Sequence, residues 1–187
     1  CTLRAIMPRR GLARQGQPQM RAYLDIETTF AGGISVIGIY RPDRGTIQLV
    51  GGGVTDLNLY ASLAGISTIV TFNGSSFDLP VIRKRLLADL KVEFAHRDLL
   101  YVCRRQGLRG GLKVVEQRLG IGRATAGISG GDAPRLWSRY EAYADSRALA
   151  TLLAYNVEDV VNLATLEALL DGDQVVAPTA DLHVLME

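Results

Sequence analysis

Apolar and polar positions alternate in the segment MRAYLDIETT near the start of the chain. Tyr23, Leu24 and Ile26 favour a strand, and Asp25 and Glu27 interrupt its apolar character. Successive side chains of a strand point to opposite faces, so the two acids share one face and Ile26 lies on the other. Two solvated acids on an exposed edge would explain the pattern. A divalent metal would also explain it, because carboxylate oxygens suit Mg²⁺ or Mn²⁺ and a cation relieves their repulsion.

Three further apolar runs extend this strand into a sheet. Residues 34–40 and 46–50 are rich in β-branched residues and flank the turn signal PDRG, which predicts an antiparallel meander with the first strand. Residues 55–63 have helical spacing and lead to a short β-branched run at 67–72. That run predicts a strand that returns to the sheet through a helical crossover. The expected fold is therefore α/β, with a mixed central sheet, antiparallel in its first three strands and then parallel, flanked by helices.

The strand at 67–72 ends in the sequence NGSSFDLP, an Asn-Gly turn followed by a helix signal. Ser75 or Ser76 is the predicted helix cap, with Pro80 in the first turn. Asp78 then lies near the helix N-terminus, just beyond the C-terminal end of the strand, where ligand sites of open α/β sheets concentrate. An acid that only complements the helix dipole is the alternative for Asp78.

The second half of the chain is mostly helical in pattern. A last strand within VEFAHRDLL precedes helices at 99–105, at 112–120, from Asp132 through Tyr143, and at 146–170. The glycine-rich segment after Gly120 is a predicted loop, and it lacks the glycine spacing and Lys-Ser/Thr ending of a phosphate cradle. The tail from Asp171 is expected to be partly disordered or to dock as a strand.

Tyr155 and Asp159 lie four residues apart on the longest predicted helix, and thus on one face of it. Apolar residues cover its other sides. The pair either lines a site or belongs to the polar face of an amphipathic helix.

Composition supports a globular chain of 187 residues, with 48% hydrophobic and 21% charged residues. We expect a basic, disordered leader over 1–19, one domain over 20–172 and a tail over 173–187. No apolar run approaches the ~20 residues of a membrane helix. Two cysteines without metal-ligand spacing fit a cytoplasmic protein best.

Taken together, these motifs resemble those of the DnaQ-like 3′–5′ exonucleases of the ribonuclease H-like superfamily, also called DEDD exonucleases. The Asp-x-Glu motif of that family matches LDIETT, its second motif matches FNGSSFDLP, and the Tyr-x-x-x-Asp motif of its tyrosine subclass matches YNVEDV. Through HRDLL, LKVVEQRLGI and YNVEDVVNL, the chain is most similar to the YprB ribonuclease H-like domain group. The resemblance covers about residues 20–170.

The resemblance implies two divalent ions, Mg²⁺ or Mn²⁺, held by four acids, together with a tyrosine that orients the attacking water. The implied catalytic residues are Asp25, Glu27, Asp78, Tyr155 and Asp159, and the four acids are the implied metal ligands. Thr28 and Thr29 are implied contacts to the terminal nucleotide, and Asn73 and Phe77 are expected to shape the site. A tyrosine is a weak base at pH 7, so orientation of water suits Tyr155 better than removal of its proton.

A basic cluster follows the last predicted strand. It has a local net charge of +5 and comprises Arg97, Arg104, Arg105, Arg109, Lys113, Arg118 and Arg123, against Asp98 and Glu116. Such a cluster can follow a phosphate backbone, with Arg104, Arg105, Arg109 and Lys113 as candidate substrate contacts. Solvated faces of two helices are the alternative.

The expected function is metal-dependent 3′–5′ exonuclease activity on single-stranded DNA or RNA. Two alternatives remain, a ribonuclease H-like endonuclease or junction nuclease, and a non-catalytic nucleic-acid-binding module. The expected partner is a nucleic acid with a 3′ end, with a helicase or polymerase as a candidate for delivering it, and no membrane is involved.

Overall fold

The computed structural model describes residues 20–125, 127–179 and 181–186, so the predicted leader over 1–19 lies outside the described residues. Within them the strands form one six-stranded sheet in the order β5-β4-β1-β2-β3-β6. The strands are β1 (Arg21–Thr28), β2 (Ile34–Arg41), β3 (Gly45–Val50), β4 (Thr68–Thr71), β5 (Ala95–Asp98) and β6 (Leu182–Met186). β1, β2 and β3 are antiparallel neighbours, whereas β4 pairs parallel to β1, β5 to β4, and β6 to β3. The predicted fold class is confirmed.

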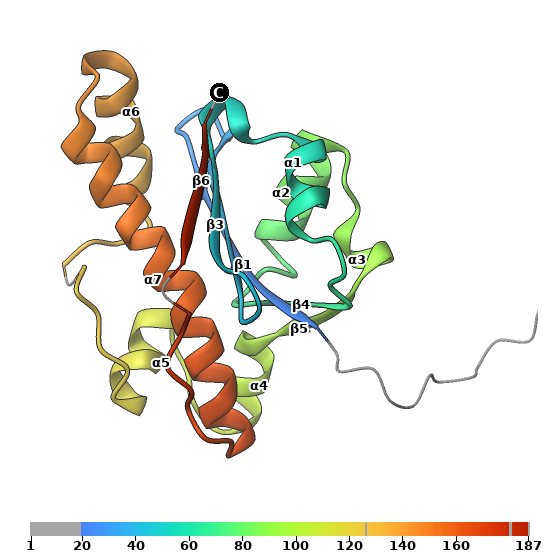
Figure 1. Cartoon of the computed structure of the whole chain (residues 1–187). Helices are drawn as coiled ribbons and strands as arrows, with labels where there is room; N and C mark the ends of the chain where they lie inside the picture. Colours follow the sequence, from blue (N-terminus) through green and yellow to red (C-terminus); the bar gives the residue numbers. More distant parts are fainter. Residues whose placement is uncertain (1–19, 126, 180, 187) are drawn as a thin grey trace, which may run out of the picture.

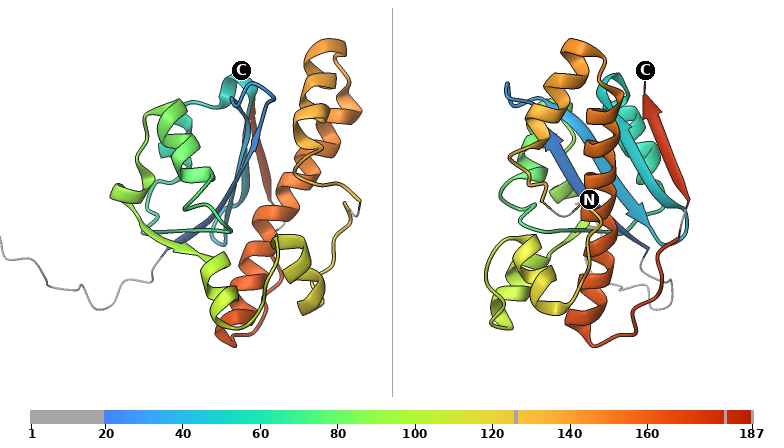
Figure 2. Two further views of the ribbon diagram at one scale, coloured as in Figure 1. Left: turned by 180° about the vertical axis from the view of Figure 1, so that it is seen from behind. Right: turned by 90° about the vertical axis from the view of Figure 1, so that its left-hand side faces the viewer.

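Helices cover both faces of this sheet (Figure 1). Their bounds are α1 (Asp56–Ser62), α2 (Asp78–Leu86), α3 (Leu90–Glu93), α4 (Leu99–Arg105), α5 (Leu112–Leu119), α6 (Ala133–Tyr143) and α7 (Ser146–Asp171), with a 3₁₀ turn at Gly51–Gly53. α1, α2 and α3 lie on one side, and α4 to α7 lie on the other, with α7 running across the sheet (Figure 2). None of the described helices combines the length and apolar composition that crossing a bilayer demands.

Strand alternation divides β1 between two cores. Leu24 and Ile26 are buried in the cluster formed with α1, α2 and α3, whereas Tyr23 is buried in the cluster formed with α4, α5 and α7. Burying one Leu or Ile side chain contributes about 1.5–3 kcal/mol to stability. This is enough to determine which face of β1 packs against α1, α2 and α3. Asp25 and Glu27 therefore face α7.

The helix starts differ in part from the sequence prediction. Thr55 caps α1 as its pattern indicates, with Oγ1 accepting from the Asn58 N–H at 3.1 Å. Neither Ser75 nor Ser76 caps α2, however, because the N-cap position is Phe77, which supplies no side-chain bond. The carboxylate of Asp98 instead accepts from the backbone N–H groups of Asn73 at 2.7 Å and Ser75 at 2.9 Å. A residue outside the predicted cap thus holds the loop that leads to Asp78.

The tail docks as a strand, one of the two outcomes expected for it. β6 pairs with β3 from Thr46↔Leu182 to Val50↔Met186, which places Leu182–Met186 at an edge of the sheet and leaves these five residues exposed. α3, by contrast, is an element that the sequence pattern did not predict.

Candidate active site

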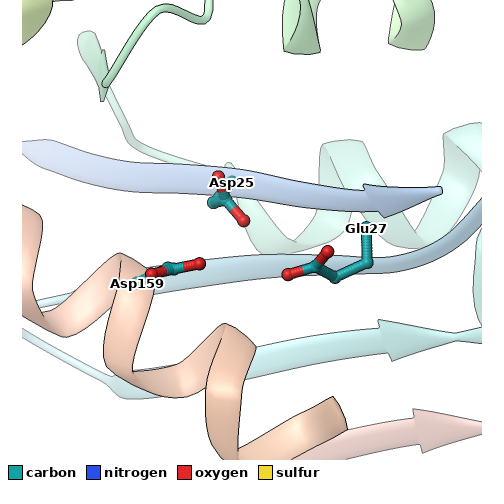
Figure 3. Close-up of side chains that lie close together, drawn as sticks. All are labelled: Asp25, Glu27 and Asp159. Atoms are coloured by element: carbon teal, nitrogen blue, oxygen red, sulfur yellow. The ribbon is translucent and has the colours of Figure 1, made fainter. Parts of the chain in front are cut away.

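Three of the predicted acids converge between β1 and α7. Asp25 and Glu27 extend from β1 toward Asp159 on α7 (Figure 3). Each offers a carboxylate oxygen, and these oxygens all lie within 4.8 Å of one another. Glu27 and Asp159 are buried and Asp25 is partly buried. Three largely buried carboxylates this close together form a site that attracts a cation.

These acids line a cavity of about 340 Å³ together with half of the other predicted site residues. The lining includes Asp25, Glu27, Thr28, Asn73, Phe77, Asp78, Tyr155 and Asp159, and also Ile26, Phe72 and Gly130. Asp78 is not among the three acids whose oxygens converge, and its Oδ1 accepts from the Ile26 N–H at 3.1 Å. That bond links the start of α2 to β1.

The turn between β4 and α2 has the backbone that its Asn-Gly sequence indicates. Asn73 has a φ of 64°, in the left-handed region that asparagine tolerates. A Cβ on Gly74 would lie 2.3 Å from Oγ1 of Thr71, so only glycine fits there. The turn brings Asn73 and Phe77 to the cavity wall.

Other predicted substrate contacts lie apart from this cavity. Thr29 lies in the turn after β1, where its Oγ1 accepts from the Gly33 N–H at 3.1 Å. Arg104 and Arg109 line a separate cavity of about 380 Å³, and Arg105 is exposed. Lys113 is the member of that set that reaches a residue of the cavity wall, since its Nζ lies 4.3 Å from the ring centroid of Tyr155.

Two members of the predicted basic cluster are engaged in ion pairs. Arg97 pairs with Glu167 at 2.9 Å and with Asp171 at 2.6 Å, both on α7. Arg123 pairs with Glu116 at 2.5 Å and also with Asp159. The charge available to a polyanion is therefore smaller than the segment's net charge of +5 indicates.

The pair between Glu116 and Arg123 is the main feature of the site that sequence reasoning missed. The side chains of Glu116 and Arg123 are only 1% and 9% exposed, and Arg123 Nη2 donates to Glu116 Oε1 at 2.9 Å and to Asp159 Oδ1. Glu158, next to Asp159, accepts from the Thr125 N–H at 3.1 Å. The loop after α5 is therefore bound to α7 at the site. The sequence signal that could have indicated this pair is Glu116, an acid among the apolar residues of LKVVEQRLG.

Burial and mutual repulsion raise the pKa of the site carboxyls. Burial and the charges of the other acids raise the pKa of Asp25 and Glu27 well above the usual range. Burial raises the pKa of Asp159 as well, although Arg123 offsets part of the rise. Burial raises the pKa of Asp78 to about 7, against the opposing effect of backbone hydrogen bonds that include the one from Ile26. The protein alone compensates only part of this negative charge.

The donor set fits divalent ions. Oε1 of Glu27 is buried and accepts no hydrogen bond from any residue that the structure describes. The Asp159 carboxylate accepts from Arg123 through Oδ1, and Tyr155 is also a hydrogen-bond partner of this carboxylate. All-oxygen carboxylate sites suit Mg²⁺ or Mn²⁺. Asp25, Glu27 and Asp159 can therefore hold such an ion, with Asp78 on the same cavity wall.

These pKa shifts predict that the metal-free protein loses stability as pH rises. A carboxyl whose folded pKa exceeds its unfolded value near 4 stabilises the fold fully below that value. This contribution is lost as pH rises through the folded pKa, about 7 for Asp78. We expect the unfolding temperature in EDTA to fall by several degrees between pH 5 and pH 8. Mn²⁺ should raise it most at pH 8, as differential scanning fluorimetry would measure.

Asp78→Asn provides the control for this pH dependence. The asparagine Oδ1 still accepts from the Ile26 N–H, but the side chain carries no proton equilibrium in this range. The variant should show a flatter dependence of unfolding temperature on pH. An unfolding temperature in EDTA that rises from pH 5 to pH 8 would contradict the assignment of crowded, buried carboxyls.

Comparisons with known proteins agree with this fold. A family B DNA polymerase from the hyperthermophilic archaeon Pyrobaculum calidifontis superimposes with a TM-score of 0.62 at 17% sequence identity. The match covers 81% of this chain and 24% of the polymerase chain, so this chain corresponds to about a quarter of that polymerase. At this identity the likeness concerns the fold alone.

No curated protein matches the chain. The family model of the RNase_H superfamily matches residues 22–171, from within β1 to the end of α7, and includes all three converging acids. The chain therefore belongs to the RNase_H superfamily.

Proposed function

We propose that this domain hydrolyses phosphodiester bonds as a 3′–5′ exonuclease on single-stranded DNA or RNA, with two divalent ions, Mg²⁺ or Mn²⁺. The observation that carries the proposal is the convergence of Asp25, Glu27 and Asp159 in one cavity that Tyr155 also lines. Membership of the RNase_H superfamily supports the nuclease chemistry. The motif resemblance supports the exonuclease direction.

In this proposal the acids act as a fixed set of ligands. When bound, divalent ions supply Lewis acidity at phosphoryl oxygens and make a water nucleophilic near neutral pH. Asp25, Glu27 and Asp159 supply the converging oxygens. Asp78 completes the acidic wall, and its bond to the Ile26 N–H limits the orientations of its carboxylate.

Tyr155 acts by orientation in this mechanism. Burial and the nearby charges of Asp159, Glu27 and Asp25 raise the pKa of its hydroxyl above the usual range, so it stays protonated at neutral pH. A protonated hydroxyl can donate one hydrogen bond and accept others, and can therefore hold a water in line with a phosphorus atom. Lys113 lies over the same ring, and its buried Nζ has no hydrogen-bond partner among the described residues. We assign it to a phosphate oxygen of the substrate.

The dimensions of the cavity favour one strand end as the substrate. At about 340 Å³ it lies near the lower limit of ligand pockets, which suits a single nucleotide better than a duplex. Phe77 is 46% exposed at its wall and offers a surface on which a base can stack. Arg104, Arg105 and Arg109 would follow the strand farther from the acids, as phosphate contacts without base specificity.

Digestion of 5′-labelled single-stranded DNA and RNA, with Mn²⁺ or with EDTA, tests this function. The expected result is a ladder that shortens from the 3′ end with Mn²⁺ and intact strands with EDTA. A few internal cuts would favour an endonuclease, and binding without cleavage would favour the non-catalytic module. Either result contradicts the exonuclease assignment.

Tyr155→Phe should reduce kcat by about 10²-fold with little change in KM. The variant no longer orients the attacking water, but its contacts with the strand remain. The pH–rate profile should keep its wild-type shape, since Tyr155 does not ionise in the working range. Tyr143→Phe is the matched control, because Tyr143 is 81% exposed on α6. Loss of one limb of the profile in Tyr155→Phe would instead make the tyrosine a base.

A further inference from the structure

A row of three paired strand residues crosses the sheet, and it begins at Asp25 of the acidic site. Asp25 of β1 pairs with Gly38 of β2, and Gly38 pairs with Gln48 of β3. Residues paired across neighbouring strands point to the same face, so all three positions face α7. Asn156, the neighbour of Tyr155 on α7, lies over this row, and both it and Gln48 are completely buried.

Hydrogen bonds connect Gln48 to Asp25 through Asn156, and each of the two amides donates to the next group toward Asp25. Gln48 Nε2 donates to the Leu153 carbonyl at 3.0 Å and to Asn156 Oδ1 at 2.9 Å. Asn156 Nδ2 in turn donates to Asp25 Oδ2 at 3.3 Å. A carbonyl can only accept, so Leu153 orients the amide of Gln48, and Gln48 in turn orients the amide of Asn156. The Asn156 group that faces Asp25 is therefore necessarily its donor, the amide Nδ2.

Gly38 makes room for this arrangement. A Cβ at that position would lie 2.2 Å from Oδ1 of Asn156 and 2.8 Å from its Cγ. Both distances are shorter than any nonbonded contact allows, so an alanine would displace the Asn156 amide. A glycine within a strand generally weakens it, and here the close approach of a side chain accounts for its presence.

We propose that Asn156 is a positioning residue that holds the carboxylate of Asp25 for a divalent ion, and that Gln48 and Gly38 act through it. This inference rests on the proposed function, because it assumes that Asp25 is a metal ligand. A neutral donor is suited to this role for two reasons. Its hydrogen bond to one oxygen restricts rotation of the Asp25 carboxylate, and it does not neutralise the negative charge that attracts the ion. Asn156 thereby restricts Asp25 in the way that Arg123 restricts Asp159.

Mn²⁺ binding by the purified protein, measured by isothermal titration calorimetry without nucleic acid, tests this role. Loss of an outer partner of a metal ligand typically weakens metal affinity by about 10–100-fold, which is the expectation for Asn156→Ala. Gln48→Met and Gly38→Ala should each weaken Mn²⁺ binding by about tenfold, although neither residue touches Asp25. Adding Gln48→Met to Asn156→Ala should cause no further loss if Gln48 acts through Asn156.

Matched controls separate positioning from general damage. Asn162→Ala removes an asparagine from α7, the helix that carries Asn156. Gly33→Ala adds a methyl group just before β2, the strand that carries Gly38, and the nearest atom would be 3.4 Å away. Both controls should bind Mn²⁺ as the wild type does. Should Asn156→Ala fail to fold by circular dichroism, Gln48→Met decides the question alone.

The two possible failures are distinguishable. If the wild type binds Mn²⁺ and Asn156→Ala or, where that variant does not fold, Gln48→Met binds it within about twofold of wild type, Asn156 is structural and the inference is wrong. If the wild type binds no Mn²⁺, the proposed metal-dependent function is itself wrong, and the positioning role is overturned with it.

Discussion

Asp25→Asn should lower nuclease activity by about 10³-fold or more while the metal-free protein stays folded. Charge stabilisation by bound metal is worth several kcal/mol in such reactions, and each 1.36 kcal/mol corresponds to a tenfold change in rate. Asparagine has nearly the shape of aspartate, and its carbonyl can still accept from Asn156 Nδ2, so the fold keeps this contact. The measurement is the rate of release of 3′-terminal nucleotides with saturating Mn²⁺.

Thermal unfolding of Asp25→Asn in EDTA distinguishes loss of chemistry from loss of fold. The unfolding temperature should equal or exceed that of the wild type, because one of several crowded carboxylates no longer repels the others. Asp56→Asn is the matched control, an exposed acid on α1 at the opposite face of the sheet, and it should retain full activity. Wild-type activity in Asp25→Asn would refute the metal site.

Arg123→Ala should destabilise the protein by about 3–5 kcal/mol, the expected cost of removing one partner of a buried ion pair. The change leaves the carboxylate of Glu116, which is 1% exposed, without a countercharge. It also removes the cation from Asp159. Urea unfolding monitored by circular dichroism measures the change in the free energy of unfolding.

Two further variants test the cause of this destabilisation. Arg118→Ala removes an exposed arginine from α5 and should change stability by no more than about 0.5 kcal/mol. Glu116→Gln should restore part of the stability when combined with Arg123→Ala, because the buried side chain then carries no charge. A cost below about 1 kcal/mol for Arg123→Ala would mean that water or another group compensates Glu116.

Local periodicity was sufficient to predict much of the fold. The alternation of β1 predicted that Asp25 and Glu27 share a face, and the spacing of Tyr155 and Asp159 predicted a common helix face. The antiparallel meander and the parallel return of β4 followed from turn chemistry and crossover length. These inferences succeeded because each depends on residues close together in the chain.

The sequence misled where partners are distant. Arg97 and Arg123 were counted as available cations, but each forms ion pairs with acids on α7. The cap of α2 was assigned to a neighbouring serine, whereas Asp98, some twenty residues later, holds that loop. Charge counts and cap rules consider only local neighbours, and a buried ion pair forms wherever docking brings opposite charges together.

By itself, the sequence determined the strand and helix periodicities, the face that carries each acid, and a motif order typical of ribonuclease H-like exonucleases. Only the tertiary structure decided that α7 covers the acidic face of β1 and that Asn156 meets Asp25, 131 positions away, and Gln48, 108 positions away. Those contacts depend on strand register and on the docking of α7 against the sheet. Both are settled by packing of the whole core, which no local pattern encodes.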